Sequence, residues 1–128
     1  MDRMQNSTPI IPTERLDSFT GSYITTALWS STDDNGEPID RSYGRDDIAD
    51  ETLAKMIADC DAFQKQNEAL LEEGTSERAG HDFWLTRNRH GAGFWDGDWP
   101  VNGDKLTEAA HAFGECHLYV GDDSKLYI

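Results

Sequence analysis

The sequence predicts an α+β fold in which a small antiparallel sheet of two hairpins packs with one long acidic helix and two shorter helices. Apolar residues recur at helical spacing in three stretches, and two other stretches alternate apolar and polar residues as strands do. Turn-forming glycine, asparagine and aspartate residues lie between these stretches. We therefore expect helix, helix, hairpin, helix and hairpin, in that order.

The chain has 128 residues, a length typical of one domain. Residues 1–17 read as a flexible N-terminal arm with one apolar pair, Ile10–Ile11, and residues 18–128 as a single α+β domain. No apolar stretch approaches the length of about 18 residues that crosses a bilayer, and the N-terminus lacks an apolar signal core. We therefore expect a cytoplasmic protein that does not associate with membranes.

The first helix is predicted from about residue 19 to 30, with Ser18 or Thr20 as its cap. The polar stretch that follows, residues 31–45, is predicted to be a loop. An EF-hand alignment places Ser42 where a bidentate glutamate is required, so a calcium site is excluded. We expect no metal and no cofactor.

The long helix is predicted from about residue 47 to 73, closed by Gly74. Its apolar stripe consists of Leu53, Met56, Ile57, Cys60, Phe63, Leu70 and Leu71. Much of its remaining surface is acidic. The candidate partner-binding residues on this acidic face are Asp50, Asp59, Asp61, Glu68, Glu72 and Glu73. An ordinary solvated helix face is the alternative interpretation.

This acidic face could imitate nucleic-acid phosphates only with help from elsewhere in the chain. Nine Asp and Glu residues lie between positions 46 and 73, which corresponds to one carboxylate per ~5 Å of helix. Duplex DNA carries one charge per about 1.7 Å of axis. Mimicry would therefore require other acids to converge on the same side, such as Asp33, Asp34, Asp122 and Asp123.

The first hairpin is predicted around the turn 88–91, because Phe83 and Leu85 alternate with polar or aromatic neighbours and Phe94 alternates with Trp95. The glycines of this turn do not form a dinucleotide-binding fingerprint, since position 96 is aspartate. The residues of this region that could contact a partner are Arg89, His90, Trp95 and Trp99.

The same region holds the only candidate for chemistry. A hairpin would bring His81 or Asp82 close to His90, which would give an acid/base pair or part of a metal site. No HExxH or CxxC motif accompanies them, and further metal ligands would have to come from Cys116 and His117. The alternative is structural: His81 and Asp82 bond backbone groups, and Arg87 pairs with a carboxylate.

The remaining elements are a helix from 104 to 113, stopped by Gly114, and a final hairpin. In that hairpin the apolar residues at 116, 118 and 120 alternate with polar ones, the turn is 121–124, and the last strand is 126–128. Cys60 and Cys116 each lie in the apolar register of an element, so we interpret both as small buried hydrophobes.

Four segments carry a resemblance to a known family: DDIADETLAKMIADCDAF, AGHDFWLTRNRHGAGFWD, LTEAAHAFGE and LYVGDDSKLYI. Together they resemble a family of short proteins encoded by bacteriophages, prophages and related mobile elements. The resemblance covers residues 19–128, and Arg89 stands where that family usually has glycine. It implies an accessory protein acting inside a bacterium, and it implies no particular reaction or ligand.

The net charge of −14 points to the class of partner. Such a charge repels nucleic acid and anionic membranes and attracts basic proteins. We therefore expect a non-enzymatic accessory protein that binds and inhibits a basic, nucleic-acid-handling host defence protein, with DNA mimicry as one route. The alternatives are a small enzyme or metal-dependent hydrolase using His81, Asp82 and His90, and a virion structural component. A homodimer is compatible with each of them.

Overall fold

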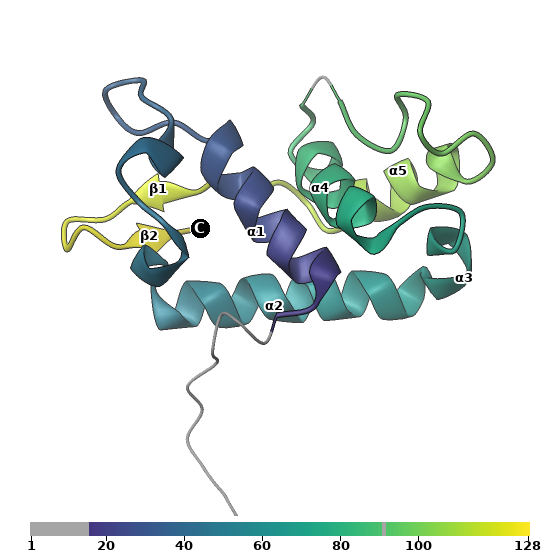
Figure 1. Ribbon diagram of the computed structural model, residues 1–128, viewed down its shortest axis with the longest axis horizontal. Helices are drawn as coiled ribbons and strands as arrows, with labels where there is room; N and C mark the ends of the chain where they lie inside the picture. Colours follow the sequence, from purple (N-terminus) through teal and green to yellow (C-terminus); the bar gives the residue numbers. More distant parts are fainter. Residues whose placement is uncertain (1–15, 91) are drawn as a thin grey trace, which may run out of the picture.

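The computed structural model describes residues 16–90 and 92–128, and these residues are mostly helical (Figure 1). The helices are α1 (Ser18–Ser30), α2 (Asp50–Gln66), α3 (Glu68–Leu71), α4 (Ser76–Arg87) and α5 (Gly103–Ala112), with 3-10 turns η2 (Ile39–Arg41) and η3 (Arg45–Asp47). The strands β1 (Tyr119–Val120) and β2 (Leu126–Tyr127) form one antiparallel sheet. The α+β prediction is confirmed in this coarse form. Most of the predicted arm, residues 1–15, lies outside the described part of the chain.

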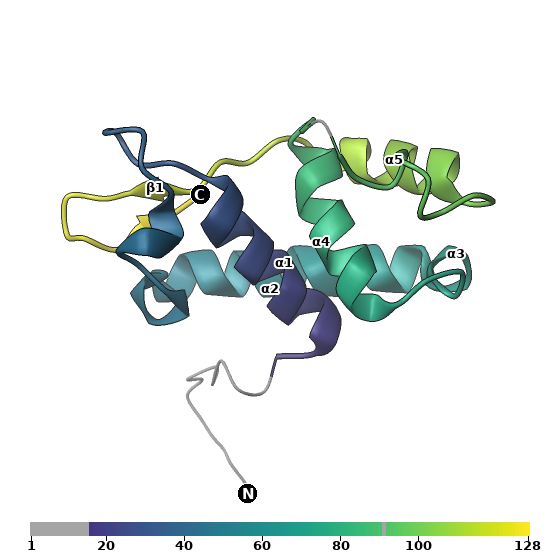
Figure 2. The same cartoon turned by 45° about the horizontal axis from the view of Figure 1, so that its top comes forward.

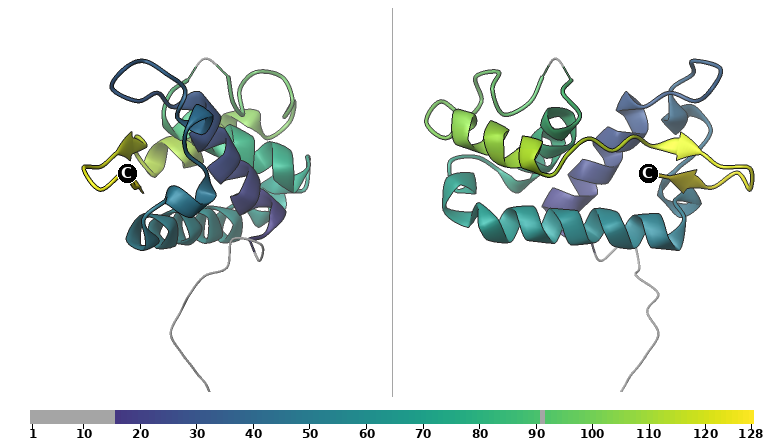
Figure 3. Two further views of the ribbon diagram at one scale, coloured as in Figure 1. Left: turned by 60° about the vertical axis from the view of Figure 1, so that its left-hand side comes forward. Right: turned by 180° about the vertical axis from the view of Figure 1, so that it is seen from behind.

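Helix α2 runs along one side of the molecule, and α1 and α4 cross over it (Figures 1 and 2). The β1–β2 hairpin lies at one end, whereas α3 and α5 lie at the other. The segment between α5 and β1 returns along the molecule from one end to the other, as the rear view in Figure 3 shows. The two ends are therefore joined by the three crossing helices and by this one extended segment.

Helices α1 and α4 form the most extensively packed pair of elements. They meet at Gly80, where a Cβ atom would lie 2.0 Å from the backbone oxygen of Phe19. Only glycine allows this close approach, because the neighbouring atom belongs to the backbone and cannot rotate away. Gly80 therefore sets the distance between the two helices.

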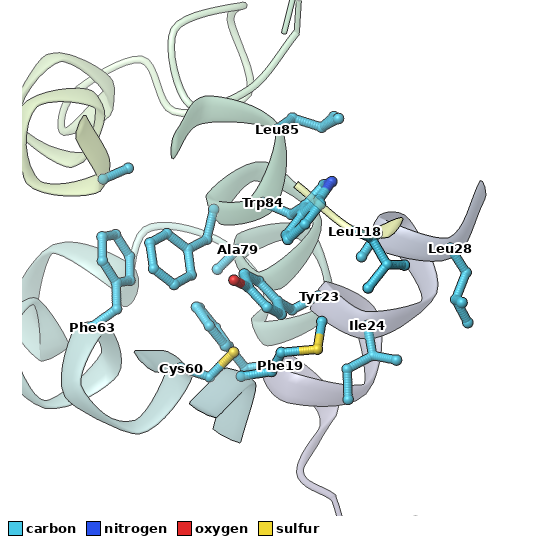
Figure 4. Close-up of a cluster of buried hydrophobic side chains, with 14 of the residues drawn as sticks. Phe19, Tyr23, Ile24, Leu28, Cys60, Phe63, Ala79, Trp84, Leu85 and Leu118 are labelled. Atoms are coloured by element: carbon cyan, nitrogen blue, oxygen red, sulfur yellow. The ribbon is translucent and has the colours of Figure 1, made fainter. Parts of the chain in front are cut away.

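The core is built from aromatic side chains of α1, α2 and α4 (Figure 4). Phe63 of α2 stacks on Phe83 of α4 with ring centroids 4.1 Å apart. Phe94, in the segment that follows α4, also stacks on Phe63, with ring centroids 5.7 Å apart. Leu118, just before β1, is also buried in this core. Burying each large apolar side chain contributes about 1.5–3 kcal/mol, so these rings are the main source of stability.

The first predicted hairpin is wrong, because residues 83–86 belong to helix α4. Thr75 caps this helix by accepting a hydrogen bond from the Arg78 amide at 3.1 Å. Every residue from 82 to 88 is buried, so the helix has no polar face to reveal its period. The chain does fold back after α4, but as a loop: the Phe94 amide donates to Thr86 Oγ1 at 3.0 Å.

Helices lie in the other three regions where they are predicted, with changed boundaries. Helix α1 is capped by Asp17, whose carboxylate accepts from the Thr20 amide at 2.7 Å, in place of Ser18 or Thr20. The long helix ends at Gln66, because Asn67 leaves helical geometry and its side chain donates to the Phe63 carbonyl at 2.9 Å. Helix α5 is followed by Gly114 at φ 80°, the left-handed conformation expected of a helix stop.

The final hairpin is confirmed in position, although its strands are shorter than predicted. Tyr119 pairs with Tyr127, and Val120 pairs with Leu126. The Ala49 amide donates to the Leu126 carbonyl at 3.0 Å, which fastens the hairpin to the start of α2. In the part of the chain that the structure describes, no helix has the length and apolar character needed to span a bilayer.

Candidate functional site

Three of the six predicted acidic-face residues, Asp61, Glu68 and Glu72, line one open pocket of about 550 Å³. The pocket lies between the end of α2, α3 and the start of α4. Its lining also includes Lys65 and apolar residues, among them Leu71. The pocket therefore combines three carboxylates and one ammonium group with an apolar floor, which suits the aliphatic stem and charged head of an arginine or lysine side chain.

The other three predicted residues lie elsewhere. Asp50 is exposed at the far end of α2, about 24 Å from the helix end that forms the pocket. Asp59 is buried and accepts from Lys55 Nζ at 2.7 Å and from Arg87 at 2.9 Å, so its inclusion in the acidic face was wrong. Glu73 is half-buried, and its carboxylate accepts from two backbone amides at the start of α5, both at 2.8 Å.

The additional acids that DNA mimicry would need are at the opposite end of the molecule. Asp33 accepts from the amides of its own loop at 2.9 and 3.0 Å, and this loop follows α1. Asp123 in the β1–β2 turn accepts from the Tyr127 hydroxyl at 2.6 Å. Both segments lie at the hairpin end, whereas α3 lies at the other end (Figure 1). These acids therefore do not converge on the pocket.

The predicted contact residues around the turn are divided between surface and interior. Trp95 is 54% exposed, and Arg89 and His90 are exposed beyond the end of α4. Arg89 has φ 59°, a left-handed conformation that glycine adopts more readily. Trp99 is only 3% exposed, so its prediction as a contact residue was wrong: its aromatic ring belongs to the core.

The predicted chemical cluster is only partly assembled. His81 Nδ1 lies 2.9 Å from Asp82 Oδ1, and Trp99 Nε1 donates to Asp82 Oδ2 at 2.7 Å. Burial raises the pKa of the Asp82 carboxyl, which outweighs the lowering effect of these two hydrogen bonds. His90 does not join the pair, because the seven helical residues from 81 to 87 already rise by about 9 Å and His90 lies beyond them.

The two further residues that a metal site would need, Cys116 and His117, have other neighbours. The thiol of Cys116 lies 4.0 Å from the Tyr23 hydroxyl, and burial raises the pKa of the thiol. His117 is exposed beside Glu115. Across residues 16–90 and 92–128, no three His, Cys, Asp or Glu side chains are grouped as a metal ion would need.

Arg87 forms a buried ion pair. The sequence predicts that it pairs with a carboxylate but does not identify the partner. The Arg87 guanidinium donates to Asp59 at 2.9 Å, to the Tyr23 hydroxyl at 3.0 Å, and to the carbonyls of Gly114 and Phe113 at 2.8 and 3.1 Å. These partners come from α1, α2 and the segment after α5. The signal in the sequence is a single arginine that follows three bulky apolar residues and Thr86. Arg87 therefore has a structural role: it joins α4 to α1, to α2 and to the segment after α5.

The exposed tryptophan Trp29 was not predicted as a site residue. It lies near the end of α1, is 47% exposed, and its ring centroid is 6.0 Å from that of His81. The order of residues along the chain could not reveal this proximity, since it depends on the crossing of α1 and α4.

Comparison with known proteins gives no relative: no protein-family model matches this chain, and neither does any curated protein or solved structure.

Proposed function

We propose that this chain is an acidic accessory protein that binds and inhibits a basic, nucleic-acid-handling protein of a bacterial host. The pocket lined by Asp61, Glu68 and Glu72 is the observation that supports the proposal most directly. These carboxylates share one depression with apolar residues such as Leu71 and Ala79. A lysine or arginine of the partner would bury its stem on the floor and pair its charge at the rim.

The charge of the whole chain supports the same class of partner. A net charge of −14 creates a long-range field that speeds the approach of a basic protein and orients it. Exposed Trp95 adds an aromatic side chain of the kind that dominates binding energy at protein interfaces. Charge would therefore set the association rate, and the pocket and aromatic contacts would set the lifetime of the complex.

The identity of the target as a defence or other nucleic-acid-handling enzyme is supported by the resemblance to phage and mobile-element proteins. Basic residues that hold nucleic-acid phosphates are the surface that a pocket of carboxylates would occupy. Inhibition would then arise from occlusion of a few phosphate-binding residues, and imitation of an extended duplex is not required.

The test uses the full chain as bait in bacterial lysate at low and high salt, followed by identification of the captured proteins. The bait variant carries Asp61→Lys, Glu68→Lys and Glu72→Lys. We expect a basic partner that is captured at low salt, released at high salt, and lost with this variant. The purified partner should also lose its affinity for duplex DNA when the unmodified chain is added.

A matched variant separates the pocket from net charge. Asp34, Asp40 and Asp46 are exposed and lie outside the pocket, and their replacement by lysine changes the charge by the same amount. This control variant should keep most of the binding. Equal loss of partner binding in both variants would mean that net charge, and not the pocket, determines binding. The absence of any salt-sensitive basic partner would overturn the proposed function.

A further inference from the structure

His81 has the arrangement of a proton-transfer residue. Its Nδ1 atom is 2.9 Å from the Asp82 carboxylate, which is 1% exposed, while the imidazole itself is partly exposed. A carboxylate at Nδ1 accepts a hydrogen bond from Nδ1–H and so leaves the lone pair on Nε2 in the neutral ring. Among the described residues, Nε2 has no hydrogen-bond partner within the chain.

Trp99 fixes the carboxylate from the other side. Its indole N–H donates to Asp82 Oδ2 at 2.7 Å, so each carboxylate oxygen has its own donor. Asp82 therefore cannot rotate without breaking a buried hydrogen bond. Because the imidazole is bonded to this fixed group, its orientation at the surface is set in advance, which is the role of the carboxylate behind a catalytic histidine.

His81 lines a small open pocket of about 310 Å³ together with Ser22, Thr75, Glu77 and Arg78. The Trp29 ring lies at the edge of the His81 ring, with centroids 6.0 Å apart and planes tilted by 31°. Within this lining the Ser22 hydroxyl donates to the Glu77 carbonyl at 2.7 Å and the Arg78 guanidinium pairs with Asp98 at 3.2 Å. The exposed Trp29 ring provides an aromatic surface beside the imidazole. An exposed aromatic ring next to the imidazole suits a small substrate that carries an aromatic group.

We propose that His81 is a general base for hydrolysis of small aryl esters, with Asp82 and Trp99 as positioning residues. Nε2 accepts a proton from a water molecule as the water oxygen bonds to the ester carbonyl carbon. The bond from that carbon to the aryloxy oxygen then breaks, and the proton on Nε2 passes to the leaving oxygen. The products are a carboxylic acid and a phenol, and His81 returns to its starting state. This activity is independent of partner binding.

The other described histidines provide internal controls. His117 is 69% exposed and is 3.3 Å from Glu115, a carboxylate that is itself half exposed. His90 is exposed beyond the end of α4, and His111 lies in the last turn of α5. None of these three is bonded to a buried carboxylate in the described part of the chain, so we expect none of them to match the reactivity of His81.

The test measures hydrolysis of p-nitrophenyl acetate by the full chain, corrected for the rate in buffer. A general base typically contributes 10²–10⁴-fold to a catalysed rate. We expect His81→Ala to lower the corrected rate at least fivefold and His117→Ala to leave it within twofold. Asp82→Asn should lower kcat while KM is retained, because it changes the orientation of the base and not the pocket.

A chemical measurement keeps the test valid if a variant folds poorly. Diethyl pyrocarbonate modifies accessible imidazoles, and mass spectrometry identifies which histidine has reacted. We expect the loss of activity in the unmodified sequence to follow the modification of His81. The proposal is overturned if the chain shows no rate above buffer, if His81→Ala lowers the rate less than fivefold, or if activity follows another histidine.

Discussion

Two buried carboxylates, Asp59 and Asp82, are held by different kinds of partner. Asp59 pairs with two cations, Arg87 inside the core and Lys55 at the surface. Asp82 is bonded to a histidine and to an indole N–H, neither of which carries a permanent charge. The Asp59 site is therefore a fixed ion pair that joins helices. The Asp82 site supports a side chain at the surface and remains sensitive to protonation.

The largest expected effect comes from breaking the first site. Arg87→Ala leaves the Asp59 carboxylate without its buried cation and two backbone carbonyls without their donor. Loss of one partner of a buried pair costs about 3–5 kcal/mol. Urea unfolding should show this loss. Arg89→Ala, on an exposed side chain two positions later, should change stability by less than about 0.5 kcal/mol; similar losses in both variants would contradict the comparison.

The second site should be less costly to break. Trp99→Phe preserves most of the aromatic ring but removes the donor to Asp82 Oδ2. A buried acceptor left without its donor costs about 1–3 kcal/mol. Trp95→Phe is the matched change at an exposed tryptophan and should be nearly neutral in the same unfolding experiment. A neutral Trp99→Phe would show that the hydrogen bond to Asp82 does not stabilise the fold.

The Asp82 site should also make stability depend on pH. Burial raises the pKa of Asp82 above its unfolded value of 3.8. The folded state therefore holds this proton more tightly, so the stability from Asp82 is present below pH 3.8 and is lost as pH rises through the folded pKa. Asp82→Asn should remove this loss. Unfolding free energies of both proteins from pH 4 upward test the sign; parallel curves would contradict it.

The smallest effect is expected at Asp61, which is exposed at the pocket only two positions after Asp59. Asp61→Asn should change the unfolding free energy by less than about 0.5 kcal/mol. The same substitution at Asp59 should cost several times more, since it removes the buried charge that faces Arg87. Equal effects at both positions would mean that burial does not distinguish these two carboxylates.

The elements that could be predicted from the sequence are those with one solvent-exposed face and one buried face. Helix α5 buries Leu106 and Ala110 and exposes Glu108 between them, so the helical period can be recognised in the sequence. Helix α4 is buried nearly all round in its second half, and a run of buried residues looks alike in a strand and in a helix. The prediction of a hairpin there failed for that physical reason.

The candidate site was predictable only where neighbours in sequence are neighbours in space. Asp61 and Glu68 lie on one side of the chain near α3, and the pocket joins them. The pairing of Asp59 with Arg87 and of Asp82 with Trp99 depends on tertiary packing across 28 and 17 positions. No local pattern contains that information, so Asp59 and Trp99 were misplaced.

The Arg87 contacts also have a consequence for the order of folding during synthesis. The guanidinium donates to the carbonyls of Phe113 and Gly114. Both residues are added to the growing chain after α1, α2 and α4 are complete. Until those residues leave the ribosome, Arg87 cannot be buried with all of its donors satisfied. The complete set of Arg87 hydrogen bonds can therefore form only after α5 and the two residues that follow it have been added to the chain.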